Sequence, residues 1–118
     1  MTVKVLTTLA RLYVDDLDRA LPALRELTGR EVGRRFAHGD VEVAGIGGFL
    51  LVAGTEEALA PYRDVQATVL VDDLDGLQAL LEARGGEVVS GPNRVPTGRN
   101  AVVRHPGGVV LEYVEHTA

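Results

Sequence analysis

The pentapeptide VDDLD occurs twice in this chain of 118 residues, at Val14–Asp18 and again at Val71–Asp75, which is an offset of 57 positions. Near the end of each half, GGFLLV at residues 47–52 matches GGVVLE at residues 107–112 at an offset of 60. A repeat of this length that occurs only twice is typical of two fused copies of one small module, not of a solenoid.

Each copy changes its hydrophobic period at the VDDLD segment. Apolar residues alternate up to its first residue, as in Leu12 and Val14, and they recur at helical spacing after it. The second aspartate of each copy, Asp16 or Asp73, suits the N-cap of the following helix, where a carboxylate accepts free backbone amides. The repeated segment therefore predicts a strand-to-helix junction and not a pair of catalytic carboxylates.

The two predicted helices differ in regularity. The second has a clear apolar stripe and should end at Gly85-Gly86 in a left-handed turn. The first contains Pro22, which lacks an amide hydrogen, so we expect its regular part to begin late. The apolar stripes consist of Leu17, Ala20, Leu21, Leu24 and Leu27 in the first helix and of Leu74, Leu77, Leu80 and Leu81 in the second.

Three short apolar or alternating runs follow each helix, separated by glycine, asparagine and aspartate. Each copy therefore predicts a βαβββ module. We expect an α+β fold in a single domain over residues 1–118, with modules at about 7–53 and 66–115 and a linker at 54–65. The helices cover the outer faces of two mixed, curved sheets, whose other faces enclose a cavity for a small molecule.

Two connecting segments are open to more than one interpretation. The segment Ser90–Asn100 contains two prolines and two glycines, and we expect a loop that either covers the cavity or merely connects strands. The linker either joins the modules within one chain or passes the second module to another chain. Because duplicated modules exchange partners easily, we expect a homodimer.

The composition excludes several classes of function. Seventeen Asp and Glu against twelve Lys and Arg give a net charge of -5, which offers no basic surface for nucleic acid. Without cysteine the chain has no disulfide and no thiolate chemistry, which fits a reducing compartment. No apolar run reaches the roughly 20 residues of a membrane span and the first residues lack a secretory pattern, so we expect a cytoplasmic protein.

These features resemble the vicinal oxygen chelate superfamily, which includes glyoxalase I, extradiol dioxygenases, fosfomycin-resistance thiol transferases and bleomycin-binding proteins. The resemblance runs from about Thr7 to Glu115 and rests on the repeated strand-then-DL joint, the repeat of 57 residues and the closing segment RHPGGVVLEYVE. It implies paired βαβββ modules. Enzymes of the superfamily typically hold a divalent metal at four positions, two in each module, filled by His, Glu or Gln.

Carried over one by one, those positions fall on Leu9, Val52, Gln66 and Glu112. Leu9 and Val52 have hydrocarbon side chains without a lone pair, and a catalytic metal usually has at least three protein ligands. None of the three histidines has HxH or HxxxH spacing. We therefore predict no resident metal and no cofactor, while weak metal binding at Gln66 and Glu112 stays open.

Strand parity predicts which side chains face the cavity. Most of the predicted wall is apolar, with few polar groups, and we assign no catalytic residue to it. The predicted ligand-binding residues are Leu9, Arg11, Tyr13, Val52, Gln66, Thr68, Asn100, Val102 and Glu112.

Glu112 is the residue with the most specific chemistry, because a carboxylate in an apolar enclosure is costly unless it meets a cation or hydrogen-bond donors. One interpretation is that it binds a cationic or hydrogen-bond-donating ligand. The other is that it pairs with Arg11 or Arg104 and has no role in binding. Gln66 is likewise either a ligand contact or a structural hydrogen bonder.

The sequence favours a metal-free protein that binds a small organic molecule, either an antibiotic or a metabolite, and resembles the drug-sequestering bleomycin-resistance branch. The alternative is a metal-dependent enzyme of the glyoxalase or dioxygenase type, a lyase, isomerase or oxygenase, with an incomplete or misaligned metal site. A third interpretation is a metal-free enzyme with Glu112 as general base. Leu9 and Val52 favour the first interpretation, and nothing in the sequence identifies the ligand.

Overall fold

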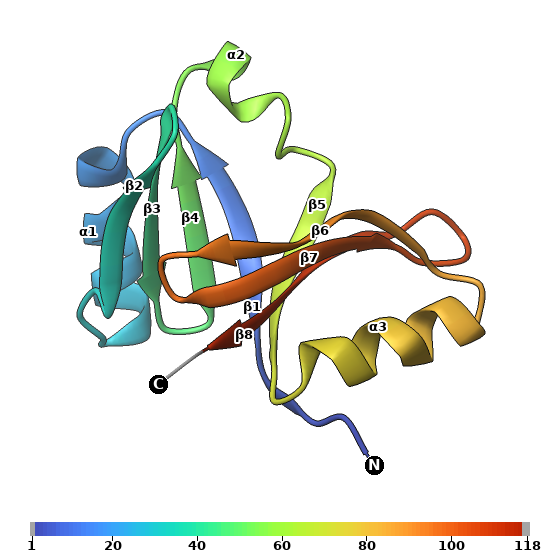
Figure 1. Cartoon of the computed structure of the whole chain (residues 1–118). Coiled ribbons are helices and arrows are strands. Elements are labelled where there is room, and N and C mark those ends of the chain that lie inside the picture. Colours follow the sequence, from blue (N-terminus) through green and yellow to red (C-terminus); the bar gives the residue numbers. More distant parts are fainter. Residues whose placement is uncertain (1, 117–118) are drawn as a thin grey trace. The chain divides into compact units, whose positions relative to one another are not determined.

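The computed structural model describes residues 2–116 and divides into two compact units (Figure 1). The N-terminal unit comprises Leu9–Asp64, and the C-terminal unit begins at Val65 and includes the residues before Leu9. Strand β1 (Val5–Val14) therefore contributes residues to both. No helix among the described residues is long and apolar enough to span a membrane.

The N-terminal unit is a mixed sheet with strand order β2-β3-β4-β1 and one long helix on it (Figure 1). β1 and β4 are parallel, whereas β3 is antiparallel to both of its neighbours. After β1, the elements are α1 (Leu17–Thr28), β2 (Arg34–His38), β3 (Val41–Ile46), β4 (Phe49–Ala53) and the short helix α2 (Glu56–Leu59).

The C-terminal unit has the corresponding strand order β5-β8-β7-β6, with β5 parallel to β8 and antiparallel pairs elsewhere. Each unit thus has the βαβββ order that the repeat predicts, and the α+β fold class is confirmed. The elements are β5 (Val65–Val71), α3 (Leu74–Ala83), β6 (Glu87–Val95), β7 (Gly98–Arg104) and β8 (Val110–His116).

Helix α1 begins at Leu17, so the prediction of a late start was wrong. The Asp16 carboxylate caps the helix by accepting the amide of Asp18 at 2.8 Å. Pro22 lies inside the helix and costs ~3 kcal/mol. Leu17 and Leu21 are each only 1% exposed, and burying such a side chain contributes about 1.5 to 3 kcal/mol. The two leucines and the cap together offset the proline.

In each unit, a helix and a sheet enclose an apolar core. The predicted stripes were too wide, because Leu27 and Leu80 lie at 76% and 49% exposure on the solvent side of their helices. The remaining apolar positions do pack inward. The buried core residues are Leu17, Leu21, Ala44, Ile46, Leu51 and Ala53 in the N-terminal unit and Val69, Val71, Leu74, Leu77, Ala101, Val103 and Tyr113 in the C-terminal unit.

The N-terminal unit has a second apolar cluster on the other face of its sheet. Val41, Val43 and Val52 pack there against Leu59 of helix α2, which is 2% exposed. The Thr55 hydroxyl accepts the amide of Ala58 at 3.1 Å and so caps α2. The predicted linker is therefore a folded cover for this sheet face.

The loop expected at Ser90–Asn100 is a β-hairpin, and this prediction was wrong. Strand β6 continues to Val95, and β7 begins at Gly98. The pairing of β6 with β7 shifts register on both sides of Ser90. Pro92 has no amide hydrogen to donate to the neighbouring strand. The register shifts let the two strands pair without that hydrogen bond, so a proline-containing segment still forms a strand.

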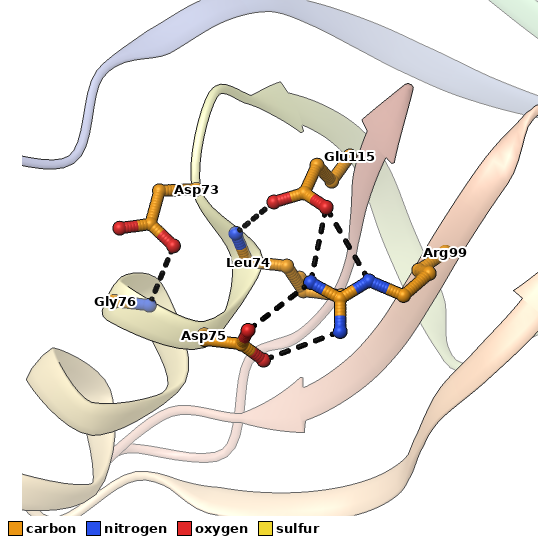
Figure 2. A network of polar contacts seen from close by, with 6 residues as sticks. All are labelled: Asp73, Leu74, Asp75, Gly76, Arg99 and Glu115. Atoms are coloured by element: carbon orange, nitrogen blue, oxygen red, sulfur yellow. Dashed lines mark hydrogen bonds and ion pairs between the residues drawn. The ribbon is translucent and has the colours of Figure 1, made fainter. Parts of the chain in front are cut away.

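The start of helix α3 is held by side chains from its own first turn and from strand β8 (Figure 2). The Asp73 carboxylate accepts the amide of Gly76 at 3.0 Å, which confirms the predicted N-cap. Glu115 accepts the amide of Leu74 at 2.9 Å. Two carboxylates thus satisfy free amides at the positive end of the helix dipole.

Arg99 of strand β7 links this helix terminus to the sheet (Figure 2). Its guanidinium donates to Glu115 at 3.0 Å and to Asp75 at 3.3 Å. The pKa of Glu115 is lowered from its ordinary value of 4.5, first by the hydrogen bond from the Leu74 amide and then by Arg99. Lowering this pKa means that the folded state favours the charged carboxylate.

We expect Glu115→Gln to lower the free energy of unfolding by about 1 to 2 kcal/mol at neutral pH, because it removes a charged acceptor at a helix N-terminus. The folded-state pKa is the lower one, so the contribution is present above about pH 4.5 and is lost as pH falls through the folded-state pKa. Urea unfolding between pH 3 and 7 measures it. Asp75→Asn is the control and should matter less, because its side chain is 72% exposed. Equal free energies of unfolding for Glu115→Gln and the unmodified protein across this pH range would contradict this account.

Candidate ligand site in the C-terminal unit

Glu112 lies in the middle of strand β8, between the two strands that pair with it. Its backbone partners are Thr68 of the parallel strand β5 and Val102 of the antiparallel strand β7. Residues opposite each other in a ladder point to the same face. The neighbours Leu111 and Tyr113 pack in the core between the sheet and helix α3. Glu112 therefore points to the opposite face of the sheet.

Both oxygens of the Glu112 carboxylate accept hydrogen bonds from neutral side chains. The hydroxyl of Thr68 donates to Oε1 at 2.8 Å, and the amide Nδ2 of Asn100 donates to Oε2 at 2.7 Å. Thr68 is 3% exposed, and Glu112 and Asn100 are partly buried. Hydrogen bonds to a charged group contribute about 1.5 to 3 kcal/mol each, so these two support a carboxylate in partly buried surroundings.

The other end of the Asn100 amide is not satisfied. Its Oδ1 atom is buried and has no hydrogen-bond partner among residues 2–116. The amide orientation is fixed, because a reversed group would bring its oxygen against the Glu112 carboxylate in place of the 2.7 Å hydrogen bond. A buried amide oxygen without a donor costs about 1 to 3 kcal/mol, so this atom is a place where a donor is expected.

The positions of the N-terminal unit that are equivalent to Asn100 and Glu112 carry hydrocarbons. The offset of 60 residues relates Glu112 to Val52, and the strand pairing of Val43 with Val52 matches that of Val102 with Glu112. Val52 is 3% exposed and packs against Leu59. The first copy is therefore apolar at the position of Glu112, whereas the offset of 57 places Arg11 at the position of Thr68.

Two further predicted residues, Arg11 and Tyr13, meet in a cluster of the N-terminal unit. Arg11 donates to the Tyr13 hydroxyl at 3.2 Å, and this hydroxyl donates to the carbonyl of Tyr62. The guanidinium groups of Arg11 and Arg63 lie 6.0 and 5.8 Å from the centre of the Tyr13 ring. Sequence reasoning missed Tyr62 and Arg63, because they lie in the linker, where no periodicity assigns a face.

The remaining predicted residues have less defined roles. Leu9 and Val102 are partly buried, and Gln66 is exposed. Gln66 lies at an irregularity in the pairing of β5 with β8, between Val65 and Thr68, so simple alternation does not fix its direction. Arg104, one of the two partners considered for Glu112, donates to Glu87 at 2.7 Å.

His105 lies in the turn between β7 and β8 and has a structural role there. Its amide donates to the carbonyl of Val109 at 2.7 Å, and its Nε2 lies 2.7 Å from the hydroxyl of Tyr113. Burial raises the pKa of Tyr113 above its ordinary value of 10.0. The histidine thus gives a polar partner to a tyrosine hydroxyl in the core, as a buried tyrosine requires.

A separate depression of about 450 Å³ lies in the N-terminal unit, over the junction between β1 and α1. Its polar lining is acidic and includes Asp15, Asp18 and Glu42. Arg35 already contacts two of these carboxylates, at 2.9 Å to Asp18 and 3.5 Å to Glu42. Its hydrogen bond lowers the pKa of Asp18, so the arrangement is that of a surface ion-pair network.

The residues at the four metal positions do not fit a divalent ion. Leu9 and Val52 have no donor atom, and Gln66 has only an amide. Glu112 is then the one carboxylate among the four positions. Among residues 2–116, no three side chains of His, Cys, Asp or Glu gather closely enough to hold a metal. The donor set is thus too small and too weak for a dedicated site.

A comparison with protein-family models identifies one family. A family model described as the Glyoxalase/Bleomycin resistance protein/Dioxygenase superfamily matches residues 7–113. A Methanosarcina mazei protein of solved structure, described as uncharacterized, is 49% identical with a TM-score of 0.89, and the match covers 97% of this chain and 94% of that one. A search of curated proteins gives no match.

Two solved methylmalonyl-CoA epimerases are similar at the level of the fold. The enzyme from Mycobacterium tuberculosis is 23% identical with a TM-score of 0.78, over 97% of this chain and 90% of that one. The enzyme from Streptomyces coelicolor, in complex with 2-nitronate-propionyl-CoA, is 21% identical with a TM-score of 0.73, over 99% of this chain and 100% of that one.

We expect the purified protein to retain less than one tenth of an equivalent of zinc, iron, nickel, cobalt or manganese after dialysis against a chelator, because two of the four metal positions are hydrocarbons. Elemental analysis by mass spectrometry measures this content. Reloading with each ion before a second, chelator-free dialysis is the control for losses during purification. One equivalent retained in either preparation would show that donors outside the four positions complete a site.

Proposed function

Because this chain belongs to the Glyoxalase/Bleomycin resistance protein/Dioxygenase superfamily, we propose that it binds a small organic molecule without a resident divalent metal. We further propose that binding uses the face of the C-terminal unit that carries Thr68, Asn100 and Glu112. The function is then sequestration, as in the bleomycin-resistance branch, with an antibiotic or a metabolite as the ligand. The superfamily includes both binding proteins and enzymes. The residues of the site are therefore needed to distinguish the two functions.

The observation that supports this proposal most directly is the way in which the Glu112 carboxylate is held. Two neutral side chains donate to it at 2.8 and 2.7 Å, so the carboxylate is held in a defined orientation. Each carboxylate oxygen has two lone pairs and can accept a further donor, whereas a dedicated metal site would need ligands that Leu9 and Val52 do not supply. A held carboxylate is instead suited to a hydrogen-bond donor or a cation on an organic ligand.

The electrostatic surroundings support the same kind of ligand. The chain has a formal net charge of -5, which attracts cations and repels anions at long range. The neighbouring ladder positions of Glu112 are Thr68 and Val102, one with a hydroxyl and one apolar. A mostly apolar face with one oriented carboxylate is typical of a small-molecule site in which one polar group fixes the ligand's orientation.

We expect a thermal-shift screen of a diverse small-molecule library to find ligands that raise the melting temperature equally with and without a chelator. For ligands with a donor or cationic group, Glu112→Gln should weaken binding about 10-fold to 100-fold, because a charged hydrogen bond contributes roughly 1.5 to 3 kcal/mol. Isothermal titration calorimetry measures the affinities.

Glu115→Gln is the matched control, because this glutamate lies on the same strand, three residues away, and is engaged at the start of helix α3. It should lower stability and leave the ligand affinity unchanged. Binding that disappears in the chelator would contradict metal independence. Equal affinities for Glu112→Gln and the unmodified protein would remove Glu112 from the site.

A second candidate function is an isomerase of the epimerase kind, which the fold-level similarity to methylmalonyl-CoA epimerases favours. In this case Glu112 is the candidate general base, because a partly buried carboxylate can exchange a proton with a bound substrate. Incubating the protein with methylmalonyl-CoA in deuterated water distinguishes the two functions. Deuterium exchange that Glu112→Gln abolishes would favour the enzyme, whereas sequestration requires none.

The homodimer expected from the duplicated modules stays a prediction. Val5 and Leu6 at the beginning of strand β1 are 60% and 61% exposed, which is apolar area that a second chain would cover. A dimer would add stability to each chain by mass action.

A further inference from the structure

Strand β6 has an extra residue between Ser90 and Asn93. Ser90 pairs with Val102 of strand β7. Three positions later, Asn93 pairs with Asn100, which is only two positions from Val102. In a regular strand, residues three positions apart point to opposite faces, but the extra residue, a β-bulge, turns Asn93 to the face of Ser90. Because residues opposite each other in a ladder share a face, this is also the face of Glu112, which pairs with Val102.

Gly91 allows this bulge to form. Its φ is 102°, a backbone conformation that residues with a Cβ rarely adopt. A Cβ at this position would lie 2.6 Å from the carbonyl oxygen of Asn100 and 3.0 Å from Cα of Ala101. Strand β6 thus approaches β7 so closely here that no side chain fits. The bulge depends on the glycine that the sequence has at this position.

The side chains of Ser90 and Asn93 contact each other and form a small polar unit, the Ser90–Asn93 pair. Nδ2 of Asn93 donates to the Ser90 hydroxyl at 3.0 Å. The hydroxyl hydrogen and Oδ1 of Asn93 make no further hydrogen bond with residues 2–116. The reversed amide would exchange these roles, so in either orientation the pair presents a donor and an acceptor. Both residues are exposed, so a ligand reaches these groups by displacing water.

The first copy shows that the fold does not require this arrangement. Its edge strand β2 pairs with β3 residue for residue, without an extra residue. The residue opposite Val43 is Phe36, which packs against the apolar cluster beneath Leu59. Val43 corresponds to Val102 in the repeat, so Phe36 corresponds to Ser90. The edge strand is thus regular and apolar on this face in one copy, and bulged and polar in the other.

Protection of an exposed sheet edge does not by itself explain the Ser90–Asn93 pair. Strand β6 is the last strand of its unit, and bulges and proline at such an edge prevent pairing with other chains. This protection works with polar groups on either face. In β6 the two polar side chains share one face and are hydrogen-bonded to each other. That face is the one on which the proposed ligand site lies.

We propose that Ser90 and Asn93 are specificity-determining residues of the ligand site, which bind a carboxamide group of the ligand at the β6 edge. A carboxamide carries a donor N–H and an acceptor C=O on one planar group, so it pairs with both side chains at once. A ketone or a tertiary amide has only an acceptor and satisfies one of them. This proposal rests on the proposed function and adds the chemical class of one ligand group.

The experiment compares neutral probes that share one aromatic ring. Benzamide has a donor and an acceptor, whereas N,N-dimethylbenzamide and acetophenone have an acceptor only. Affinities are measured by titration with two-dimensional NMR of uniformly ¹⁵N-labelled protein. The side-chain amide of Asn93 and the backbone amides of β6 then report contact at this edge directly. Because the probes are uncharged, the net charge of the protein does not separate them.

We expect benzamide to bind about 5-fold more tightly than either acceptor-only probe, because each of these leaves one group of the Ser90–Asn93 pair unsatisfied. Ser90→Val should weaken benzamide about 5-fold, whereas Ser90→Thr has the same shape, keeps the hydroxyl and should bind like the unmodified protein. Asn93→Leu should weaken benzamide as Ser90→Val does. Arg94→Gln is the control and should change none of these ratios, because Arg94 pairs with Arg99 and lies on the opposite face.

Equal affinities for benzamide and the two acceptor-only probes would overturn the inference. So would benzamide binding that shifts signals only outside β6, or library ligands that bind while benzamide does not. In each of these cases the proposed function still stands. That function fails, and the inference with it, when neither a library compound nor a probe binds. The comparison of the probes uses the unmodified protein, so it decides the inference even if a variant does not fold.

Discussion

The junction between strand and helix in each copy is the constraint on which the rest of the structure depends. Asp16 and Asp73 each cap a helix that begins directly after a strand. A cap that close to the strand fixes the direction of the helix, so its apolar stripe must pack on one face of the sheet that the same module builds. The opposite face of each sheet is therefore not covered by this helix.

The two copies use this second face differently. In the N-terminal unit it carries Val41, Val43 and Val52, and Leu59 of the linker covers them. In the C-terminal unit it carries Thr68, Asn100 and Glu112, which are hydrogen-bonded to one another. Duplication gives both copies the same strand order, and substitution makes the positions of Val41 and Val52 apolar where the second copy has Asn100 and Glu112.

Local patterns predicted the parts of the fold that depend on local physics. The caps at Asp16 and Asp73 and the order of elements follow from hydrophobic period and from residues with strong preferences at helix ends. The start of α1 was missed because burial of Leu17 and Leu21 outweighs the local effect of Pro22, and such burial depends on tertiary packing. The hairpin across Ser90–Asn100 was missed for a similar reason, since register shifts that accommodate proline depend on the neighbouring strand.

Local sequence patterns are limited in the same way for the residues of the site. Strand parity predicts a common face for Asn100 and Glu112, but it cannot show which atoms meet, because that depends on cross-strand register and side-chain rotamer. The register brings Nδ2 of Asn100 to the carboxylate and so leaves Oδ1 without a donor. Two neutral side chains thus orient the carboxylate, and the amide oxygen of Asn100 is a buried acceptor without a donor among residues 2–116. Which atoms meet at a superfamily position is thus decided by the register of β7 and β8, which no local pattern in the sequence encodes.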